Sequence, residues 1–220
     1  MKAKDLKILR KNLAKLNKAD NDPLDGIAQE LCTIAPPPNV DSQTTKKNKA
    51  LFVTAARSAD ISAKKFGSML SLFERNMGEM YKNSSWGLDA EEKAQELRHP
   101  NARFLLVETS SSPSSHGDDL AGFVHFRFDY DDDEQPTEGV VYVYEIQIDE
   151  QFQRQGLGKR LMDLAEQMAS KAELAKVMLT VFKSNQSAMS FYQRIDYGID
   201  PSSPSKHNEP ADYEILSKTL

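Results

Sequence analysis

Apolar residues recur at intervals of three and four in several stretches of the chain, and this spacing predicts amphipathic helices. Three stretches are long, at residues 1–18, 66–81 and 157–172, and two are short, at residues 89–98 and 185–194. Each helix places its apolar residues on one face, so each needs a sheet or another helix to cover that face.

Runs of β-branched and aromatic residues between these stretches predict strands. The expected strands cover residues 51–55, 103–109, 120–129, 140–148 and 176–182, a short segment near Tyr197, and residues 213–216. A turn at residues 110–119 joins the second and third strands into a hairpin. The fourth and fifth strands flank a helix, so they form a βαβ unit whose strands are parallel or splayed. The pattern predicts an α/β fold.

The N-terminal region has a different character from the rest of the chain. It carries a stripe of leucines on an otherwise basic helix, at Leu6, Leu9, Leu13 and Leu16. We expect this helix to pack on the domain with its basic face in solvent, although nuclear-localisation and nucleic-acid-binding segments have similar charge patterns. Three consecutive prolines, 36–38, begin a polar connection. We therefore divide the chain into a basic helical extension and linker at 1–49 and a domain at 50–220.

The composition is that of one ordinary globular domain, because 39% of the 220 residues are hydrophobic and 28% are charged. The formal charge of −5 provides no general attraction to nucleic acid or to an anionic membrane. Cys32 is the single cysteine, so the chain can form no intramolecular disulfide or Cys-based metal cluster. No segment approaches the length of about 20 apolar residues that spans a bilayer. We expect a soluble, intracellular protein that needs no membrane and no direct contact with nucleic acid.

A glycine turn between the strand 140–148 and the following helix carries the clearest sign of chemistry. Gly156 and Gly158 lie where the backbone N–H groups at the start of the helix are free to bind an anion. Arg154, Lys159 and Arg160 add positive charge beside them. The spacing lacks the third glycine of a Rossmann fingerprint and the Gly-Lys-Ser or Gly-Lys-Thr of a P-loop. The turn therefore predicts a pyrophosphate site of another kind.

This turn resembles the signature of the GNAT superfamily of acetyl-CoA-dependent N-acetyltransferases, with Gln153, Gly156 and Gly158 in the expected positions. Asn185, Ala188, Phe191 and Tyr192, after the strand 176–182, also resemble that family. The resemblance implies a GNAT-like fold, in which a mixed central sheet with splayed central strands is flanked by helices. It implies acetyl-CoA as co-substrate. The implied cofactor-binding residues are Ile146, Gln147, Ile148, Gln153, Arg154, Gln155, Gly156, Leu157, Gly158, Lys159, Arg160, Asn185 and Tyr192.

Within the superfamily, the chain looks like the N-alpha-acetyltransferase D group. The residues that carry this likeness include the segment 142–145, the run from His125 to Asp129 and the closing segment 213–216. The likeness implies acetylation of the N-terminal amine of core histones of the 2A and 4 types, by a monomer found in nucleus and cytoplasm. The implied substrate-binding residues are Tyr81, Trp86, Tyr142, Tyr144, Thr180 and Tyr213.

Direct transfer to an amine requires a base, and an α-amino group with a pKa near about 8 needs only a modest one. Glu145 is our first candidate for this base, and the family resemblance implies the same position. The resemblance also implies that Asp129 is a second acid that helps to bind or deprotonate the amine. In a regular strand Tyr142 and Tyr144 share one face and Glu145 points to the other. A β-bulge would bring all three to one pocket, so we predict a bulge here. Tyr192 resembles a proton donor to CoA sulfur, and we assign it to the cofactor only.

Several alternatives stay open at this stage. The acceptor could be a lysine or a small-molecule amine, or the domain could be a silent module that binds CoA or histone tails. The acidic run at residues 129–134 could attract a basic histone tail or could simply be a solvated loop. The four histidines show no metal-ligand spacing, so we predict no metal.

Overall fold

The computed structural model describes residues 3–18, 51–109, 119–132 and 134–220. The linker, most of the turn expected at 110–119 and Asp133 of the acidic run lie outside these residues. The strands are β1 (Phe52–Arg57), β2 (Arg103–Glu108), β3 (Leu120–Tyr130), β4 (Gly139–Ile148), β5 (Lys176–Phe182), β6 (Gly198–Ile199) and β7 (Tyr213–Thr219). The helices are α1 (Ala3–Leu16), α3 (Ala63–Lys82), α4 (Ala90–Leu97), α5 (Leu157–Lys171) and α6 (Gln186–Arg194), with short 3₁₀ turns at 58–60, 150–152 and 204–207.

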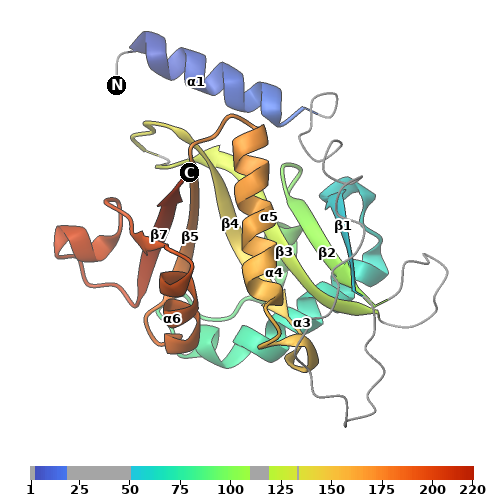
Figure 1. Cartoon of the computed structure of the whole chain (residues 1–220). Coiled ribbons are helices and arrows are strands. Elements are labelled where there is room, and N and C mark those ends of the chain that lie inside the picture. Colours follow the sequence, from blue (N-terminus) through green and yellow to red (C-terminus); the bar gives the residue numbers. More distant parts are fainter. Residues whose placement is uncertain (1–2, 19–50, 110–118, 133) are drawn as a thin grey trace.

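The strands form one mixed sheet of seven in the order β1-β2-β3-β4-β5-β7-β6 (Figure 1). All neighbours are antiparallel except β4 and β5, which α5 connects and which run parallel. The hairpin of β2 with β3 and the βαβ unit are therefore confirmed. The last strand is longer than the segment 213–216 expected from the sequence, because it extends to Thr219 along β5.

Helices cover both faces of this sheet, and β2 shows why its sequence is apolar throughout. Leu105 and Val107 point into the core beneath α5, whereas Phe104 and Leu106 point into a second core beneath α3 and α4. A strand buried on both faces loses the alternation of polar and apolar residues that marks a half-exposed strand. The fold is thus a three-layer α/β arrangement, and β4 lies near its centre.

Helix α1 packs across one end of the sheet through its leucine stripe and through a cap at its C-terminus. Leu13 is buried in the core that α5 covers. Arg103 of β2 is only 2% exposed, and its guanidinium donates to the carbonyl of Leu16 and to Asn17 Oδ1, each at 3.0 Å. A cation that binds the last carbonyls of a helix also complements the helix dipole. Among the described helices, none combines the length and the apolar character that crossing a bilayer requires.

Two alanine substitutions on α1 test whether this helix belongs to the folded unit. Leu13→Ala should lower the free energy of unfolding by about 2 kcal/mol, because it removes a buried leucine and leaves a partly relaxed cavity. Ile8→Ala is the matched control, since Ile8 is 50% exposed and should change stability by less than about 0.5 kcal/mol. Urea unfolding measures both, and equal values for the two variants would contradict the packing of α1.

Candidate active site

The pairing of β3 with β4 contains the β-bulge that the sequence predicted. Phe126 of β3 lies opposite Val143, but the residue that precedes it, His125, lies opposite Glu145. Tyr144 is therefore an extra residue on β4. A bulge of this kind interrupts the ladder and reverses the faces to which the following side chains point.

The reversal puts the polar end of β4 on one face of the sheet. Val141 and Val143 before the bulge pack in the core beneath α5, and so do Ile146 and Ile148 after it. The side chains that remain point to the opposite face, where α3 and α4 lie, and these are Tyr142, Tyr144, Glu145 and Gln147. Tyr142, Tyr144 and Glu145 therefore share one face of the sheet, which a regular strand would not allow.

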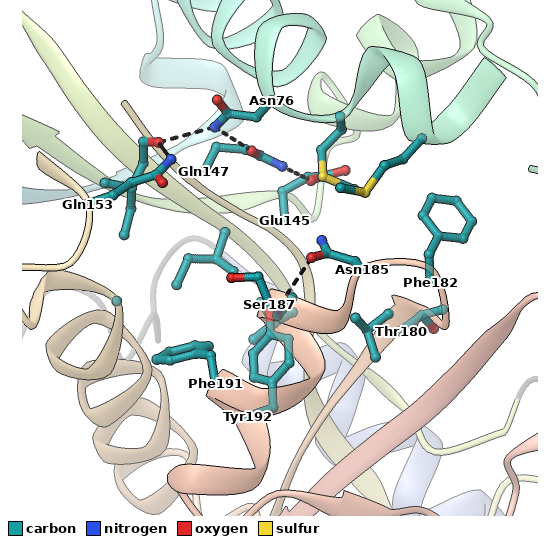
Figure 2. A pocket seen from close by; sticks show the side chains of 18 of the residues that line it. Asn76, Glu145, Gln147, Gln153, Thr180, Phe182, Asn185, Ser187, Phe191 and Tyr192 are labelled. Atoms are coloured by element: carbon teal, nitrogen blue, oxygen red, sulfur yellow. Dashed lines mark hydrogen bonds between the residues drawn. The ribbon is translucent and has the colours of Figure 1, made fainter. Parts of the chain in front are cut away.

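A cleft opens where β4 and β5 separate. Their parallel pairing covers only Val141–Val143 of β4 and Val177–Leu179 of β5. The cleft beyond this point has a volume of about 630 Å³ and is lined by α3, β4, β5, the glycine turn and α6. Figure 2 shows Asn76, Gln147 and Glu145 along one wall, with Asn185 and Tyr192 across from them.

The glycine turn forms the end of the cleft at the start of α5. Gly156 has φ +80°, the left-handed conformation that glycine adopts without strain, and no side chain caps the helix. A Cβ atom on Gly158 would lie 3.3 Å from the ring of Phe191, so glycine lets α5 begin close to α6. Arg154 and Lys159 also line the cleft here. An uncapped helix terminus between two cations fits a pyrophosphate group.

Glu145 lies at the other end of the cleft and is only 6% exposed. Its carboxylate accepts hydrogen bonds from Lys93 Nζ at 2.8 Å and from Gln147 Nε2 at 2.7 Å. Asn76 donates to Gln147 Oε1 at 2.9 Å and to the carbonyl of Ile148 at 3.1 Å, which fixes the orientation of the Gln147 amide. Two oxygens held by two donors keep the carboxylate in one position, and each oxygen can accept one more hydrogen bond.

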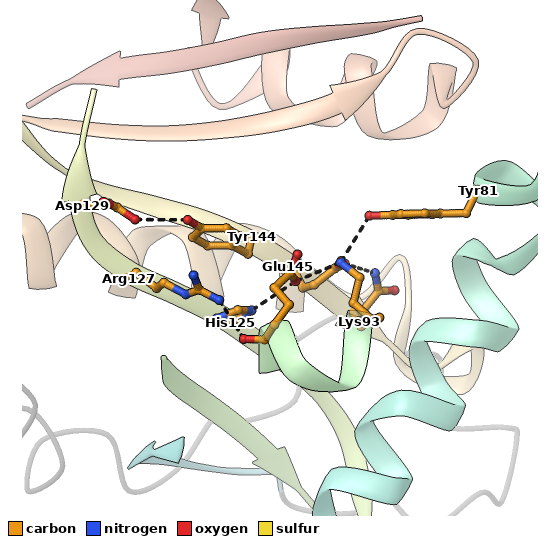
Figure 3. Close-up of polar contacts among 9 residues, drawn as sticks. Tyr81, Lys93, His125, Arg127, Asp129, Tyr144 and Glu145 are labelled. Atoms are coloured by element: carbon orange, nitrogen blue, oxygen red, sulfur yellow. Dashed lines mark hydrogen bonds and ion pairs between the residues drawn. The ribbon is translucent and has the colours of Figure 1, made fainter. Parts of the chain in front are cut away.

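Asp129 and Tyr144 form a second polar group near Glu145. The Tyr144 hydroxyl donates to Asp129 Oδ2 at 3.1 Å, and the Arg127 guanidinium lies 4.2 Å from the centre of the Tyr144 ring. Burial and the Asp129 charge raise the pKa of Tyr144, so its hydroxyl keeps its proton and remains a donor. Figure 3 shows Tyr144 between Asp129 and Glu145. On the same face, the Tyr142 hydroxyl lies 2.5 Å from Thr180 Oγ1.

An aromatic group borders the mouth of the cleft. Trp86 is half exposed and lies against Phe182 and Tyr213, with ring centres 4.9 and 5.1 Å apart. The neighbouring residue, Ser85, donates twice to the carboxylate of Asp212, from its N–H at 2.6 Å and from its hydroxyl at 3.0 Å. These two bonds join the loop after α3 to the loop before β7, so both loops shape the entrance together.

Most residues expected at the site line this cleft. They are Tyr81, Trp86, Tyr144, Glu145, Ile146, Gln147, Ile148, Gln153, Arg154, Gly156, Gly158, Lys159, Thr180, Asn185 and Tyr192.

The remaining expected residues lie outside its wall for identifiable reasons. Leu157 faces the core beneath α5, and Gln155 and Arg160 are exposed on the surface. Asp129 bonds to Tyr144, and Tyr213 packs on Trp86 and pairs with Phe182. The Tyr142 hydroxyl bonds to Thr180. In the acidic run, Asp131 and Asp132 accept bonds from backbone N–H groups of residues 134–138, so their carboxylates organise their own loop.

Sequence reasoning missed several residues of the site, above all Lys93 and Asn76. Lys93 occurs in a helix rich in charge, where a lysine is normally solvated. Its position four residues before the buried Leu97 was the available signal, because residues i and i+4 share a helix face. The cleft wall also includes Met77, Met80, Phe182, Ser187, Phe191 and Arg194. Within the described residues, no group of His, Cys, Asp or Glu side chains could hold a metal ion.

Comparison with known proteins gives a consistent result. The sequence profile described as the acetyltransferase (GNAT) family matches residues 68–197. A spermine/spermidine N(1)-acetyltransferase of Bacillus subtilis (strain 168) is 31% identical over 80 residues, which are 36% of this chain and 53% of that protein. The chain thus spans about half the length of that relative.

Solved structures share the fold at low sequence identity. A GNAT family acetyltransferase from Listeria monocytogenes 4b F2365 superposes with a TM-score of 0.56 at 16% identity, covering 86% of this chain and 99% of that one. The NatC complex bound to Gag peptide and CoA gives a TM-score of 0.53 at 15% identity, covering 76% and 98%. These two similarities show that the helices and strands have the same arrangement.

The contact between Ser85 and Asp212 can be tested with the single tryptophan of the chain, Trp86. Asp212→Asn leaves one acceptor oxygen where two are needed, so the loop should loosen and Trp86 should leave Phe182. Its emission maximum should then move to longer wavelength and its quenching by acrylamide should increase. Asp60→Asn is the control, because it makes the same change at an exposed site beside β1. Unchanged emission in Asp212→Asn would show that the loop does not depend on this contact.

Proposed function

The chain belongs to the acetyltransferase (GNAT) family, and from that premise we propose that it transfers acetyl from acetyl-CoA to the N-terminal α-amine of a protein. One observation carries the proposal. A buried carboxylate, Glu145, is held in a fixed position in the cleft, among the aromatic residues that line its acceptor end. A carboxylate in that position can receive an ammonium group and take its proton.

The donor end of the cleft is suited to coenzyme A. Its pyrophosphate would accept hydrogen bonds from the N–H groups at the start of α5, beside Arg154 and Lys159. Residues 146–148 of β4 have backbone groups that β5 does not pair, and these can bind the amides of the pantetheine arm. Acetyl-CoA supplies an activated acetyl thioester at the point where the two strands separate.

The acceptor end is suited to a primary amine on a small residue. An ammonium group near Glu145 would lose one proton to its carboxylate, directly or through one water molecule, and become a nucleophile. An α-amine has a pKa near about 8, whereas a lysine side chain has one near about 10.4, so the α-amine demands less of this base. Tyr81, Trp86 and Thr180 restrict the space beside Glu145.

We further propose that the acceptor is a serine-starting histone of the 2A or 4 type, and that the enzyme acts as a monomer in nucleus and cytoplasm. The support is the likeness of residues 142–145 and 213–216 to the N-alpha-acetyltransferase D group, together with the negative charge of Glu145 and Asp129 at the acceptor end. Solved complexes of this fold include one with a bound peptide and CoA.

A small-molecule amine is the second candidate acceptor. The relative from Bacillus subtilis is described as acting on spermine and spermidine, and those cations would also be attracted by the carboxylates near this cleft. The aromatic residues at the entrance offer a packing surface to the side chains of a peptide, which a polyamine lacks, and this favours a chain terminus.

The acceptor can be identified by incubating the protein and acetyl-CoA with three compounds. These are a histone 4 N-terminal peptide, the same peptide blocked at its α-amine, and spermidine. We expect mass spectrometry to locate the acetyl group on the α-amine of the free peptide, and no transfer to the blocked one. Equal transfer to the blocked peptide would show that the acceptor is a lysine side chain. Faster transfer to spermidine would show that the acceptor is a small-molecule amine.

Glu145→Gln tests the base. The substitution keeps the shape of the side chain and its contact with Lys93, but a neutral amide cannot accept the proton. Turnover should fall by about tenfold or more, whereas the affinity for CoA, followed by titration calorimetry, should persist. Glu92→Gln makes the same change on the exposed face of α4 and should keep full activity. Full turnover in Glu145→Gln would remove Glu145 from the mechanism.

A further inference from the structure

Lys93 is a buried cation shared between two carboxylates. Its ammonium lies 2.8 Å from Glu145 Oε1, 2.8 Å from Glu96 Oε1 and 3.3 Å from the Tyr81 hydroxyl (Figure 3). It also lies 4.8 Å from the centre of the Phe73 ring, which attracts a cation through its negative face. Three hydrogen-bonding partners use all three N–H bonds of the ammonium.

The charge state of Lys93 follows from this environment. Burial alone would lower its pKa, but the carboxylates of Glu145 and Glu96 together raise the pKa above its ordinary value. Lys93 is therefore an ammonium at neutral pH. Glu96 has a pKa raised by burial, although Lys93 opposes that shift. With both glutamates ionised, one positive and two negative charges leave the cluster with a net charge of −1, counted over Lys93, Glu96 and Glu145.

The other elements around Glu145 contribute neutral rings and two residues of β3 with opposite charges, Arg127 and Asp129. His125 of β3 lies opposite Glu145 and is fully buried, and burial holds its pKa well below the usual range, so the ring is neutral. Tyr81 of α3 and Tyr192 of α6 have pKa values raised by burial and are neutral phenols. Arg127 of β3 donates to the carbonyl of Glu96 at 2.7 Å, farther along the network.

We propose that Lys93 is a positioning residue for acetyl transfer, which holds the Glu145 carboxylate in place while Glu96 shares its positive charge. The inference rests on the proposed role of Glu145 as base. A lysine paired with Glu145 alone would neutralise it and weaken it as a base. Because Glu96 shares the cation, Glu145 is fixed in position and the cluster still attracts the ammonium of the acceptor.

This arrangement predicts opposite effects for the two partners of Glu145. Without the cation, a buried carboxylate beside another carboxylate holds its proton to higher pH; without Glu96, the cation acts on Glu145 alone and the proton leaves at lower pH. The acid limb of the pH profile of kcat/KM reports the base of the free enzyme. Lys93→Met should therefore move this limb upward by about one pH unit, and Glu96→Gln should move it downward.

The experiment measures kcat/KM between pH 4 and 9 for the full chain, with acetyl-CoA and the histone 4 peptide, so that the range includes the ordinary titration range of a carboxyl group. Besides the two variants above, it includes Lys93→Arg, which keeps the positive charge and should restore most of the wild-type profile, and Glu92→Gln, which should leave the profile unchanged. The alkaline limb, set by the peptide amine, should stay constant in all variants and serves as the internal reference.

Three results are informative. Opposite movements of the acid limb support the proposal. A lower rate with an unmoved limb in both Lys93→Met and Glu96→Gln would show that the cluster only stabilises the fold, and would overturn it. Lys93→Met leaves two buried carboxylates without a cation and its folding is checked by circular dichroism. If Lys93→Met does not fold, the other two variants decide. A downward movement of the acid limb in Glu96→Gln, together with a wild-type profile in Lys93→Arg, supports the proposal. An unmoved limb in Glu96→Gln or an altered profile in Lys93→Arg overturns it.

The proposed function has its own controls. A wild-type protein that transfers no acetyl group to the α-amine, or a fully active Glu145→Gln, would refute that function before the Lys93 variants are compared.

Discussion

The end of the hydrogen-bond ladder between β4 and β5 is the constraint on which the rest of the site depends. Two parallel strands at the centre of a sheet normally pair along their length, but here the pairing stops after Val143 and Leu179. Backbone N–H and C=O groups in a protein interior require partners. The separated strands therefore leave polar backbone facing the cleft in which we propose that acetyl-CoA binds.

The separation of the strands also places requirements on the side chains of β4. The strand must keep its apolar side chains beneath α5 on both sides of the bulge, and it must turn its polar side chains toward α3 and α4. A carboxylate buried in this way is costly unless it is paired and hydrogen-bonded. Lys93 from α4 and Gln147 from β4 meet that requirement. Stability and chemistry thus depend on the same contacts.

Local sequence patterns were sufficient to predict the helices and strands and to locate the glycine turn at the donor end of the cleft. The repeat from Phe66 to Tyr81 predicted α3, and Gly156 and Gly158 located the start of α5, because spacing and backbone conformation are local properties. The bulge was predicted from a conflict within one strand. The contact of Ser85 with Asp212 joins residues 127 positions apart, so no local pattern could reveal it. The spacing of Lys93 to Leu97 marked its face of α4 as apolar, but only the tertiary packing shows that Glu145 lies against that face.

The extra residue in β4 has a consequence for how this strand can change. If the same residues paired regularly with β3, without the bulge, every side chain after Tyr144 would lie on the other face of the sheet. Glu145 would enter the apolar core beneath α5, while Ile146 would take a place in the cleft. Removing Tyr144 together with the bulge would leave Glu145 and Ile146 on their present faces, and it would remove the hydroxyl that bonds to Asp129. A single insertion or deletion elsewhere in β4 would instead exchange the faces of all the side chains on one side of it.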